Sequence, residues 1–310
     1  MQPSGAVLGA DPRMPGWMGR LESQGLADSS IEKYTRDLAQ FITYCRYKRV
    51  AVEEADWSFL EEWIRHLRAA GRAPMSINGK LQAVGSFYDY LLRLGKIQHN
   101  PRKDVRSLKN PKKVPQYLSE EATGDLLSKV KERLDLAMLE TLYGCGLRNS
   151  EVCSVNTRDV LWDEAIFRVM GKGSKERLVP IPITCLQALK AWLPERERRI
   201  ARWPQRDTGG ALFVNTLGRR YTPFSVRTVL RRVALQLGIK GRFYPHLFRH
   251  SYATHMYNAG ADIRALQELL GHGHLQTTEI YTHVGYKKLS QTVRQFHPRS
   301  GGVPPCQTAS

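Results

Sequence analysis

The chain has 310 residues, and its 47 Lys and Arg outnumber its 29 Asp and Glu, which gives a formal net charge of +18. This length predicts two domains, since a domain spans about 100–200 residues, and a hydrophobic share of 42% excludes a wholly disordered chain. No apolar run approaches the roughly 18 residues that cross a membrane, and no secretory signal is visible. We expect a cytoplasmic protein with no membrane partner, and the charge favours nucleic acid.

The first part of the chain, residues 16–98, has a helical pattern throughout and follows a Gly- and Pro-rich segment, 1–15, that we expect to be disordered. Apolar residues recur at intervals of three to four positions, the period of an amphipathic helix. The helical patterns begin after the capping residues Ser29 and Ser30, near Phe59, and at Pro74. Because nothing here alternates with a period of two, we predict an all-helical domain.

Residues 99–116 interrupt the helical pattern with three prolines and six basic residues. Proline favours extended backbone, so we predict an extended basic linker between the two domains. Two interpretations stay open for it: a segment that follows a phosphate backbone, or a solvated tether.

The second part, residues 117–298, mixes helical and strand patterns and ends in a flexible tail, 299–310. Two β-like runs within residues 165–182 flank a Gly- and Lys-rich turn, which predicts a hairpin. Helical patterns resume from Thr184 to Tyr286 and beyond. Residues 111–310 carry 30 basic and 17 acidic side chains, so +13 of the +18 lies in this part.

Arg148 follows two glycines and opens a helical pattern, with Glu151 three residues later on the same helix face. A carboxylate that binds the guanidinium group would hold it in a position to bind a phosphate. An ordinary surface ion pair is the other interpretation.

Lys172 lies in the glycine-rich turn of the predicted hairpin, where it could reach a phosphate or remain a solvated turn residue. A nucleotide-binding loop would need a glycine five residues before Gly171-Lys172, and Ile166 stands there instead. We therefore expect no nucleotide and no other cofactor.

His246 and Arg249 follow Pro245 at helical spacing, which places a proton acceptor beside a fixed cation. His246 and His250 have the i, i+4 spacing of a zinc pair, but Leu247 stands where a zinc protease has Glu. The five cysteines are scattered and form no C-x-x-C, so we expect reduced thiols and no metal.

His272 lies in a Leu-Gly-His-Gly-His stretch, and Tyr281 follows it by nine residues. A single tyrosine among thirteen is ordinarily a packed aromatic, so only the whole set of residues singles this one out. In chain order that set is Arg148, Lys172, His246, Arg249, His272 and Tyr281.

These six residues, in this order and spacing, resemble the tyrosine recombinase (phage integrase) family, and the His-Pro-Arg ending is most similar to its Xer-type members. The resemblance implies two domains. One is an all-α, SAM-like core-binding domain over 16–98. The other is a catalytic domain over 117–298, mainly helical, with a small antiparallel sheet.

The family's reaction is transesterification of DNA, in which Tyr281 would form a 3′-phosphotyrosyl bond and release a 5′-hydroxyl. The resemblance makes Arg148, Arg249 and His272 stabilisers of the transition state. Lys172 would be the general acid and His246 the general base or proton relay, with Glu151 in a supporting role. No metal or ATP is implied.

The partner implied by the resemblance is a double-stranded DNA recombination site, held by a homo- or hetero-tetramer that exchanges the C-terminal helix, 285–296, between protomers. A partner recombinase or an accessory motor protein could take part, in the cytoplasm at the nucleoid. The expected DNA-contact residues are Lys80, Arg102, Lys103, Lys112, Lys113, Arg227, Arg231 and Arg232.

Several roles remain open within and beside this family. The chain could resolve DNA dimers as Xer proteins do, or integrate and excise a mobile element as a phage or transposon integrase does. A type IB topoisomerase-like enzyme shares the residue types, and a catalytically silent DNA-binding protein is the alternative from another class.

Overall fold

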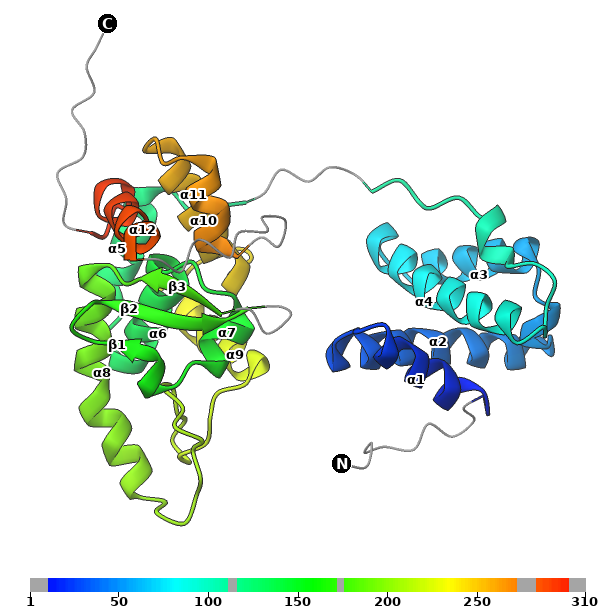
Figure 1. Ribbon diagram of the computed structural model, residues 1–310, viewed down its shortest axis with the longest axis horizontal. Coiled ribbons are helices and arrows are strands. Elements are labelled where there is room, and N and C mark those ends of the chain that lie inside the picture. The colour runs from blue at the N-terminus through cyan, green and yellow to red at the C-terminus, as the bar shows by residue number, and fades with distance from the viewer. Residues whose placement is uncertain (1–10, 111–115, 172–175, 272–282, 301–310) are drawn as a thin grey trace, which may run out of the picture. The chain divides into compact units, whose positions relative to one another are not determined.

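The computed structural model describes residues 11–110, 116–171, 176–271 and 283–300, with the side chains of 283–288 left aside. The chain divides into two compact units, Met1–Lys113 and Val114–Ser310 (Figure 1). The first is helical, and the second is mainly helical with a small antiparallel sheet, as predicted. No helix in the described ranges is long and apolar enough to span a membrane.

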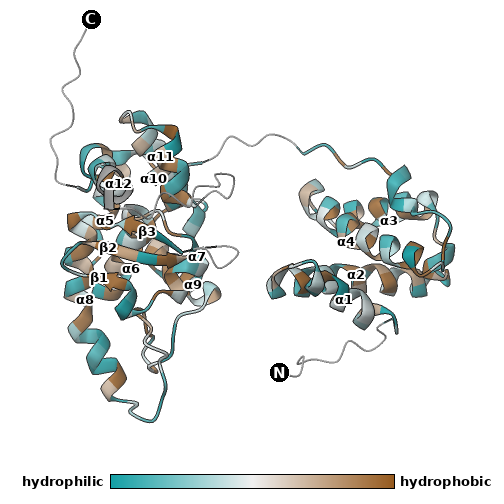
Figure 2. Ribbon diagram, in the orientation of Figure 1, coloured by the Kyte–Doolittle hydropathy of each residue, from teal (hydrophilic) through white to brown (hydrophobic). Residues whose placement is uncertain are grey.

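The described residues of the N-terminal unit form a bundle of four α-helices, α1 (Met14–Ser23), α2 (Asp28–Lys48), α3 (Trp57–Ala69) and α4 (Pro74–Arg93). Aromatic side chains, Trp17, Phe41, Trp63, Phe87 and Tyr88 among them, fill its core. Pro74 opens α4 as predicted. Helix α2 begins one residue before Ser29, and its N-cap is Ala27. Figure 2 shows hydrophobic residues recurring between hydrophilic ones along these helices, the pattern of a one-sided core.

The start of the expected linker packs on the N-terminal unit instead of forming an extended tether. Asn100 donates from Nδ2 to the carbonyl of Gly85 at 3.0 Å, and Asn78 exchanges two 2.9 Å hydrogen bonds with the backbone of Leu108. Val105 is buried in the core. The prolines and charges of this segment suggested exposure, but its side-chain amides and apolar residues bind it to α4.

The C-terminal unit is built around the buried helix α6 (Arg133–Gly144), which packs against α8 (Ile183–Ala201) and α10 (Pro245–Asn258). Three strands, β1 (Val160–Leu161), β2 (Ile166–Met170) and β3 (Glu176–Pro180), form an antiparallel sheet in chain order. The β2–β3 pair is the predicted hairpin, with Phe167 opposite Val179. The remaining helices are α5 (Glu120–Lys129), α7 (Asn149–Ser154), α9 (Pro223–Gln236), α11 (Ile263–Leu270) and α12 (His283–Phe296).

Residues 202–222 contain no helix, although the sequence pattern suggested helices from Thr184 onward. This segment is held by side chains from elsewhere in the unit. Trp192 and Arg196 of α8 donate to the carbonyls of Leu212 and Ala211 at 2.9 and 2.8 Å. Such contacts between distant residues are invisible to a periodicity analysis.

Cys45, Cys145, Cys153 and Cys185 are free and buried, in agreement with the expected reduced thiols, and Cys306 lies outside the described residues.

Candidate active site

Four of the seven predicted catalytic and supporting residues lie in the described part of the chain: Arg148, Glu151, His246 and Arg249. Lys172, His272 and Tyr281 lie outside it, as do the expected DNA contacts Lys112 and Lys113.

Arg148 is the N-cap residue of α7, and Glu151 closes the first turn of that helix. The Glu151 carboxylate accepts the Arg148 backbone N–H at 2.7 Å and its Nη1 at 2.8 Å. One carboxylate thus caps the helix and fixes the guanidinium, because an anion at N3 satisfies a free donor there. This confirms the pairing expected from the i, i+3 spacing.

Arg177 of β3 holds the same carboxylate, and sequence reasoning did not find it. Its Nη1 and Nη2 donate to the two oxygens of Glu151, both at 2.8 Å. Burial by itself raises the pKa of Glu151, but the hydrogen bonds and charge of Arg177, followed by those of Arg148, outweigh it and lower the pKa to about 2. Glu151 is therefore a carboxylate under all ordinary conditions.

Arg249 lies on α10 and is only 7% exposed. Its Nη1 donates to the carbonyl of Gly146 at 2.6 Å, and its Nη2 donates to the carbonyl of Leu270. Burial, followed by the nearby charge of Arg148, lowers the pKa of Arg249 to about 10, so the group remains cationic at neutral pH. Its fork is fixed by backbone oxygens before any substrate arrives.

His246 lies in the first turn of α10, which Pro245 opens as predicted. Partial burial, followed by the charges of His250 and Arg249, lowers the pKa of His246 below its usual 6.5. The neutral imidazole is thus favoured near pH 7, the form that accepts a proton.

The three arginines meet at the C-terminus of α11. Arg177, Arg249 and Arg148 donate to consecutive carbonyl oxygens at that end, those of Leu269 (3.2 Å), Leu270 and Gly271 (2.9 Å). The last carbonyls of a helix have no partner within it and carry partial negative charge, so guanidinium groups bind them well. His272 is the next residue in the chain.

This cluster carries three guanidinium groups against one carboxylate, an excess of two positive charges. A phosphodiester carries one negative charge and two non-bridging oxygens, which can accept two parallel hydrogen bonds from a guanidinium group. The described residues include no group of three or more His, Cys, Asp or Glu that could hold a metal ion.

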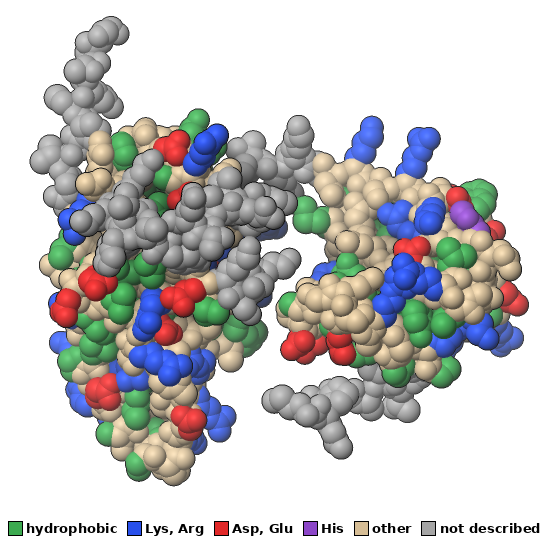
Figure 3. All heavy atoms as spheres, viewed as in Figure 1, with side chains coloured by type: hydrophobic (Ala, Val, Ile, Leu, Met, Phe, Trp, Pro, Cys, Tyr) green, Lys and Arg blue, Asp and Glu red, His purple; other side chains and the backbone are tan. Residues whose placement is uncertain are grey.

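The expected DNA-contact residues are placed differently from one another. Arg227, Arg231 and Arg232 are exposed on α9, and Arg232 pairs with the buried Asp135. Lys103 is exposed, whereas Arg102 is half-buried and donates to the carbonyl of Val105. On the face visible in Figure 3, basic side chains lie among acidic ones on both units.

Lys80 departs from the expectation of a groove contact. It is 6% exposed, and its Nζ binds Asp37 at 2.9 Å and Gln40 at 2.7 Å. Because this ammonium is buried and bound to two side chains of α2, the structure gives Lys80 a role in joining α4 to α2.

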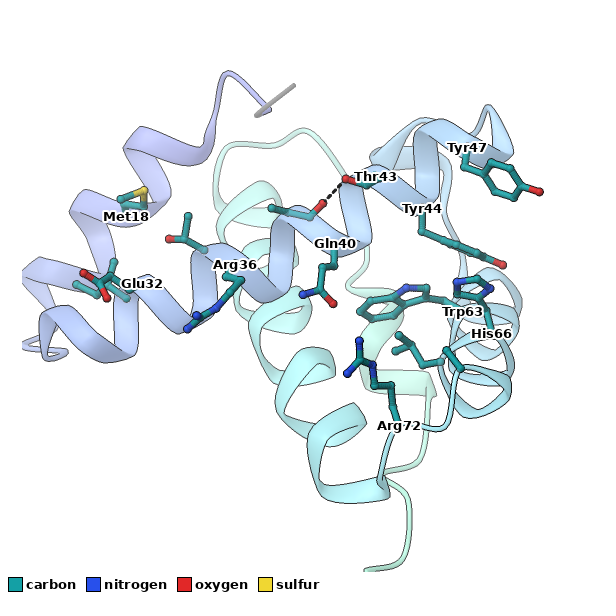
Figure 4. A pocket seen from close by; sticks show the side chains of 15 residues that line it. Met18, Glu32, Arg36, Gln40, Thr43, Tyr44, Tyr47, Trp63, His66 and Arg72 are labelled. Atoms are coloured by element: carbon teal, nitrogen blue, oxygen red, sulfur yellow. Dashed lines mark hydrogen bonds between the residues drawn. The ribbon is translucent and has the colours of Figure 1, made fainter. Parts of the chain in front are cut away.

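A hollow of about 870 Å³ lies on the N-terminal unit between α2 and α3. In Figure 4, Gln40, Trp63 and Arg72 turn toward this space. None of the six motif residues lines it, so it is separate from the arginine cluster of the other unit.

Comparison with known proteins gives matches to two domain families over most of the chain. The phage integrase family matches residues 116–288, and the N-terminal SAM-like domain of phage integrases matches residues 17–95. Tyrosine recombinase XerC of Myxococcus xanthus is 38% identical over 290 residues, covering 90% of this chain and 95% of that protein. Tyrosine recombinase XerD of Oceanobacillus iheyensis is 33% identical, covering 89% and 95%.

Two solved structures share the fold. The Tn1549 transposon integrase in complex with circular intermediate DNA has a TM-score of 0.70 at 19% identity, over 89% of this chain and 97% of that one. The XerH recombinase bound to a palindromic difH substrate has a TM-score of 0.66 at 21% identity, over 89% and 84%.

The two family matches and the Xer relatives together cover about nine-tenths of the chain. This chain belongs to the phage integrase family and is a site-specific recombinase of the Xer type.

Proposed function

We propose that this recombinase cuts and rejoins double-stranded DNA by transesterification, with Tyr281 as the nucleophile. The main support for the proposal is that Arg148 and Arg249 both donate hydrogen bonds to carbonyls at the C-terminal end of α11, directly before His272. Family membership supports this reaction class, and the excess positive charge and N–H donors of the cluster support binding of one phosphate.

In the proposed step the Tyr281 oxygen attacks phosphorus, and the bond from phosphorus to the 5′-oxygen breaks. The products are a 3′-phosphotyrosyl bond and a 5′-hydroxyl, which attacks the phosphotyrosine of a partner duplex in the reverse reaction. The number of phosphodiester bonds is unchanged, so the exchange needs no external energy source.

Each side chain then has one task. Arg148 and Arg249 direct guanidinium N–H groups to the non-bridging oxygens, where negative charge grows in the transition state. His272 adds a hydrogen bond, Lys172 gives a proton to the leaving 5′-oxygen, and His246 takes or relays the tyrosine proton. The lowered pKa of His246 supports this last role.

The cellular role we propose is resolution of DNA dimers, or integration and excision of a mobile element, in the cytoplasm at the nucleoid. The curated relatives bear the names XerC and XerD, which favours the first role. A hetero-tetramer with a second recombinase, or help from an accessory motor, fits the same proposal.

Exchange of the C-terminal helix between protomers also belongs to the proposal. In the monomer, Leu289 and Val293 of α12 are buried in the core of their own unit. Exchange therefore requires α12 to leave this position and bury the same two residues on a neighbour.

The test uses a duplex that the wild-type chain selects from random-sequence DNA, prepared with a nick so that the cleaved end diffuses away. Wild type should give a protein–DNA adduct that survives a denaturing gel. Tyr281→Phe should give none, whereas Tyr257→Phe, which changes an exposed tyrosine of α10, should react as wild type.

An adduct that persists in Tyr281→Phe contradicts the nucleophile. Binding without any adduct from wild type favours a silent DNA-binding protein. Recombinant product with two duplexes distinguishes strand exchange from the simple relaxation of a topoisomerase.

A further inference from the structure

Arg177 is a charged side chain of β3 that the proposed mechanism does not use. We propose that it is a positioning residue for DNA cleavage, acting through Glu151 on Arg148 and through the Leu269 carbonyl on the C-terminal end of α11. This inference rests on the proposed function and adds a residue to it.

The first support is the geometry of the Glu151 carboxylate. Its two oxygens accept four hydrogen bonds of 2.7 to 2.8 Å, two from Arg148 and two from Arg177. The bidentate pair from Arg177 fixes the plane of the carboxylate, since a guanidinium fork and a carboxylate lie flat against each other. Arg148, whose side chain is 30% exposed, then binds an oxygen that cannot rotate away.

The second support is the contact between Arg177 and the end of α11. Nε donates to the Leu269 carbonyl at 3.2 Å. Gly271 has a φ of +64°, and a Cβ at that position would lie 3.2 Å from the Cδ, Nε and Cζ atoms of Arg177. The arginine therefore packs flat against the backbone at the point where α11 ends and the chain continues to His272.

The third support is the position of Arg177 in the chain. It lies five residues after Lys172, on the strand that follows the hairpin turn. One side chain thus ties together the helix of Arg148, the hairpin of Lys172 and the helix that precedes His272. The first two segments contain Arg148 and Lys172, and the third directly precedes His272.

Arg177 is a positioning residue rather than a phosphate ligand. Its side chain is 12% exposed, and Nε, Nη1 and Nη2 all donate to protein oxygens. Releasing it toward DNA would leave the buried Glu151 with one partner, a costly arrangement for a charge inside a protein. Arg148, by contrast, is 30% exposed and can give up the Gly271 carbonyl for a phosphate oxygen while it keeps its hydrogen bonds to Glu151.

The experiment measures single-turnover cleavage of the nicked duplex described above, together with the dissociation constant and the thermal midpoint. Arg177→Gln should cleave about 10- to 100-fold more slowly, because small misplacements of catalytic groups have effects of that size. The dissociation constant should stay within about twofold, since positioning affects the reaction rather than binding. Arg168→Gln, which changes an exposed arginine of the neighbouring strand, is the matched control and should cleave at the wild-type rate.

Combining Arg177→Gln with Glu151→Gln tests whether Arg177 affects the cleavage rate through Glu151. If Arg177 acts through Glu151, the double variant should be no slower than the slower single variant, because coupled residues are not additive. Losses that multiply would overturn this route, as would an affinity loss equal to the rate loss, which marks a direct DNA contact.

Arg177→Lys keeps a cation opposite Glu151 and so covers the case in which Arg177→Gln fails to fold. A single ammonium cannot span both carboxylate oxygens, so cleavage should still be slowed. A folded Arg177→Gln or Arg177→Lys that cleaves at the wild-type rate contradicts this inference alone. Absence of any adduct from wild type on the same gel contradicts the proposed function and the inference with it.

Discussion

Arg249 on α10 donates a 2.6 Å hydrogen bond to the carbonyl of Gly146, which lies 103 residues earlier in the chain. That carbonyl belongs to the turn that leads to Arg148, so this turn connects the two arginines that we propose bind the phosphate. The turn depends on a glycine. Gly146 has a φ of +58°, and a Cβ there would lie 2.7 Å from the ring of Tyr252.

Gly146→Ala should therefore destabilise the protein through both strain and crowding. A left-handed φ costs a non-glycine residue about 1–2 kcal/mol, and overpacking against a buried ring adds roughly 1–3 kcal/mol. Gly238→Ala is the matched control, because Gly238 also has a positive φ (65°) but a Cβ there meets nothing within 4 Å. Urea unfolding should show a larger loss in the free energy of unfolding for Gly146→Ala than for Gly238→Ala. Equal losses in the two variants would contradict a steric clash with the Tyr252 ring.

Stability should depend on pH through Glu151. Its pKa is about 2 in the folded protein against 4.5 for a free glutamate, so the folded state favours the carboxylate. The stabilisation, about 3 kcal/mol for a shift of this size, is present above pH 4.5 and is lost as the pH falls toward 2.

Free energies of unfolding measured from pH 6 to pH 3 check this dependence. Glu151→Gln should remove this contribution to the decrease in the free energy of unfolding at low pH. Asp163→Asn, which changes an exposed turn residue, should leave the decrease unchanged. A Glu151→Gln protein with the same acid-induced loss as wild type would show that another carboxyl is responsible.

Cleavage should depend on pH through His246. Its pKa is lowered below 6.5 by burial and by the charges of His250 and Arg249, and only the neutral imidazole accepts a proton. The single-turnover rate should therefore rise with pH through that lowered pKa and then level off.

Two variants separate His246 from its neighbour in this pH profile. His246→Gln should lower the plateau and remove the rising limb. His250→Gln should keep the limb but move it toward 6.5, since one of the charges that lower the pKa is gone. A rising limb that survives in His246→Gln would assign the proton transfer to another group.

Arg231 tests the proposed DNA contact by α9. If it binds one phosphate, Arg231→Gln should weaken DNA binding and reduce the slope of log K against log salt by about 0.9. Arg202→Gln, at the end of α8, serves as the control for an exposed arginine elsewhere on the unit. The same change of slope in both variants would indicate a diffuse charge effect instead of a contact.

Local rules predicted much of the fold. Pro74 and Pro245 open helices, and the β2–β3 hairpin lies within residues 165–182, where two β-like runs predicted it. The errors occurred where distant residues decide the structure. The segment 202–222 is held by α8 side chains, and residues 100–108 by amides of α4 and of the segment itself.

The residues of the site were likewise predictable only where their partners are close in the sequence. The Arg148–Glu151 pair was predictable because its partners are one helical turn apart. Arg177 was missed because its partner lies 26 residues earlier and is met only through the fold. The expected DNA contact at Lys80 was wrong because the partner that holds this side chain, Asp37, lies 43 residues away on α2 and cannot be inferred from the sequence of α4.

The most direct test of the central claim is to identify which of the thirteen tyrosines becomes bonded to DNA. The wild-type adduct on the nicked duplex is digested with nuclease and protease, and the peptide that carries the remaining nucleotide is sequenced by mass spectrometry. We expect a single modified peptide in which the 3′-phosphate of the nucleotide is bonded to Tyr281. A nucleotide on any other residue, or a 5′-phosphate linkage to Tyr281, would contradict it.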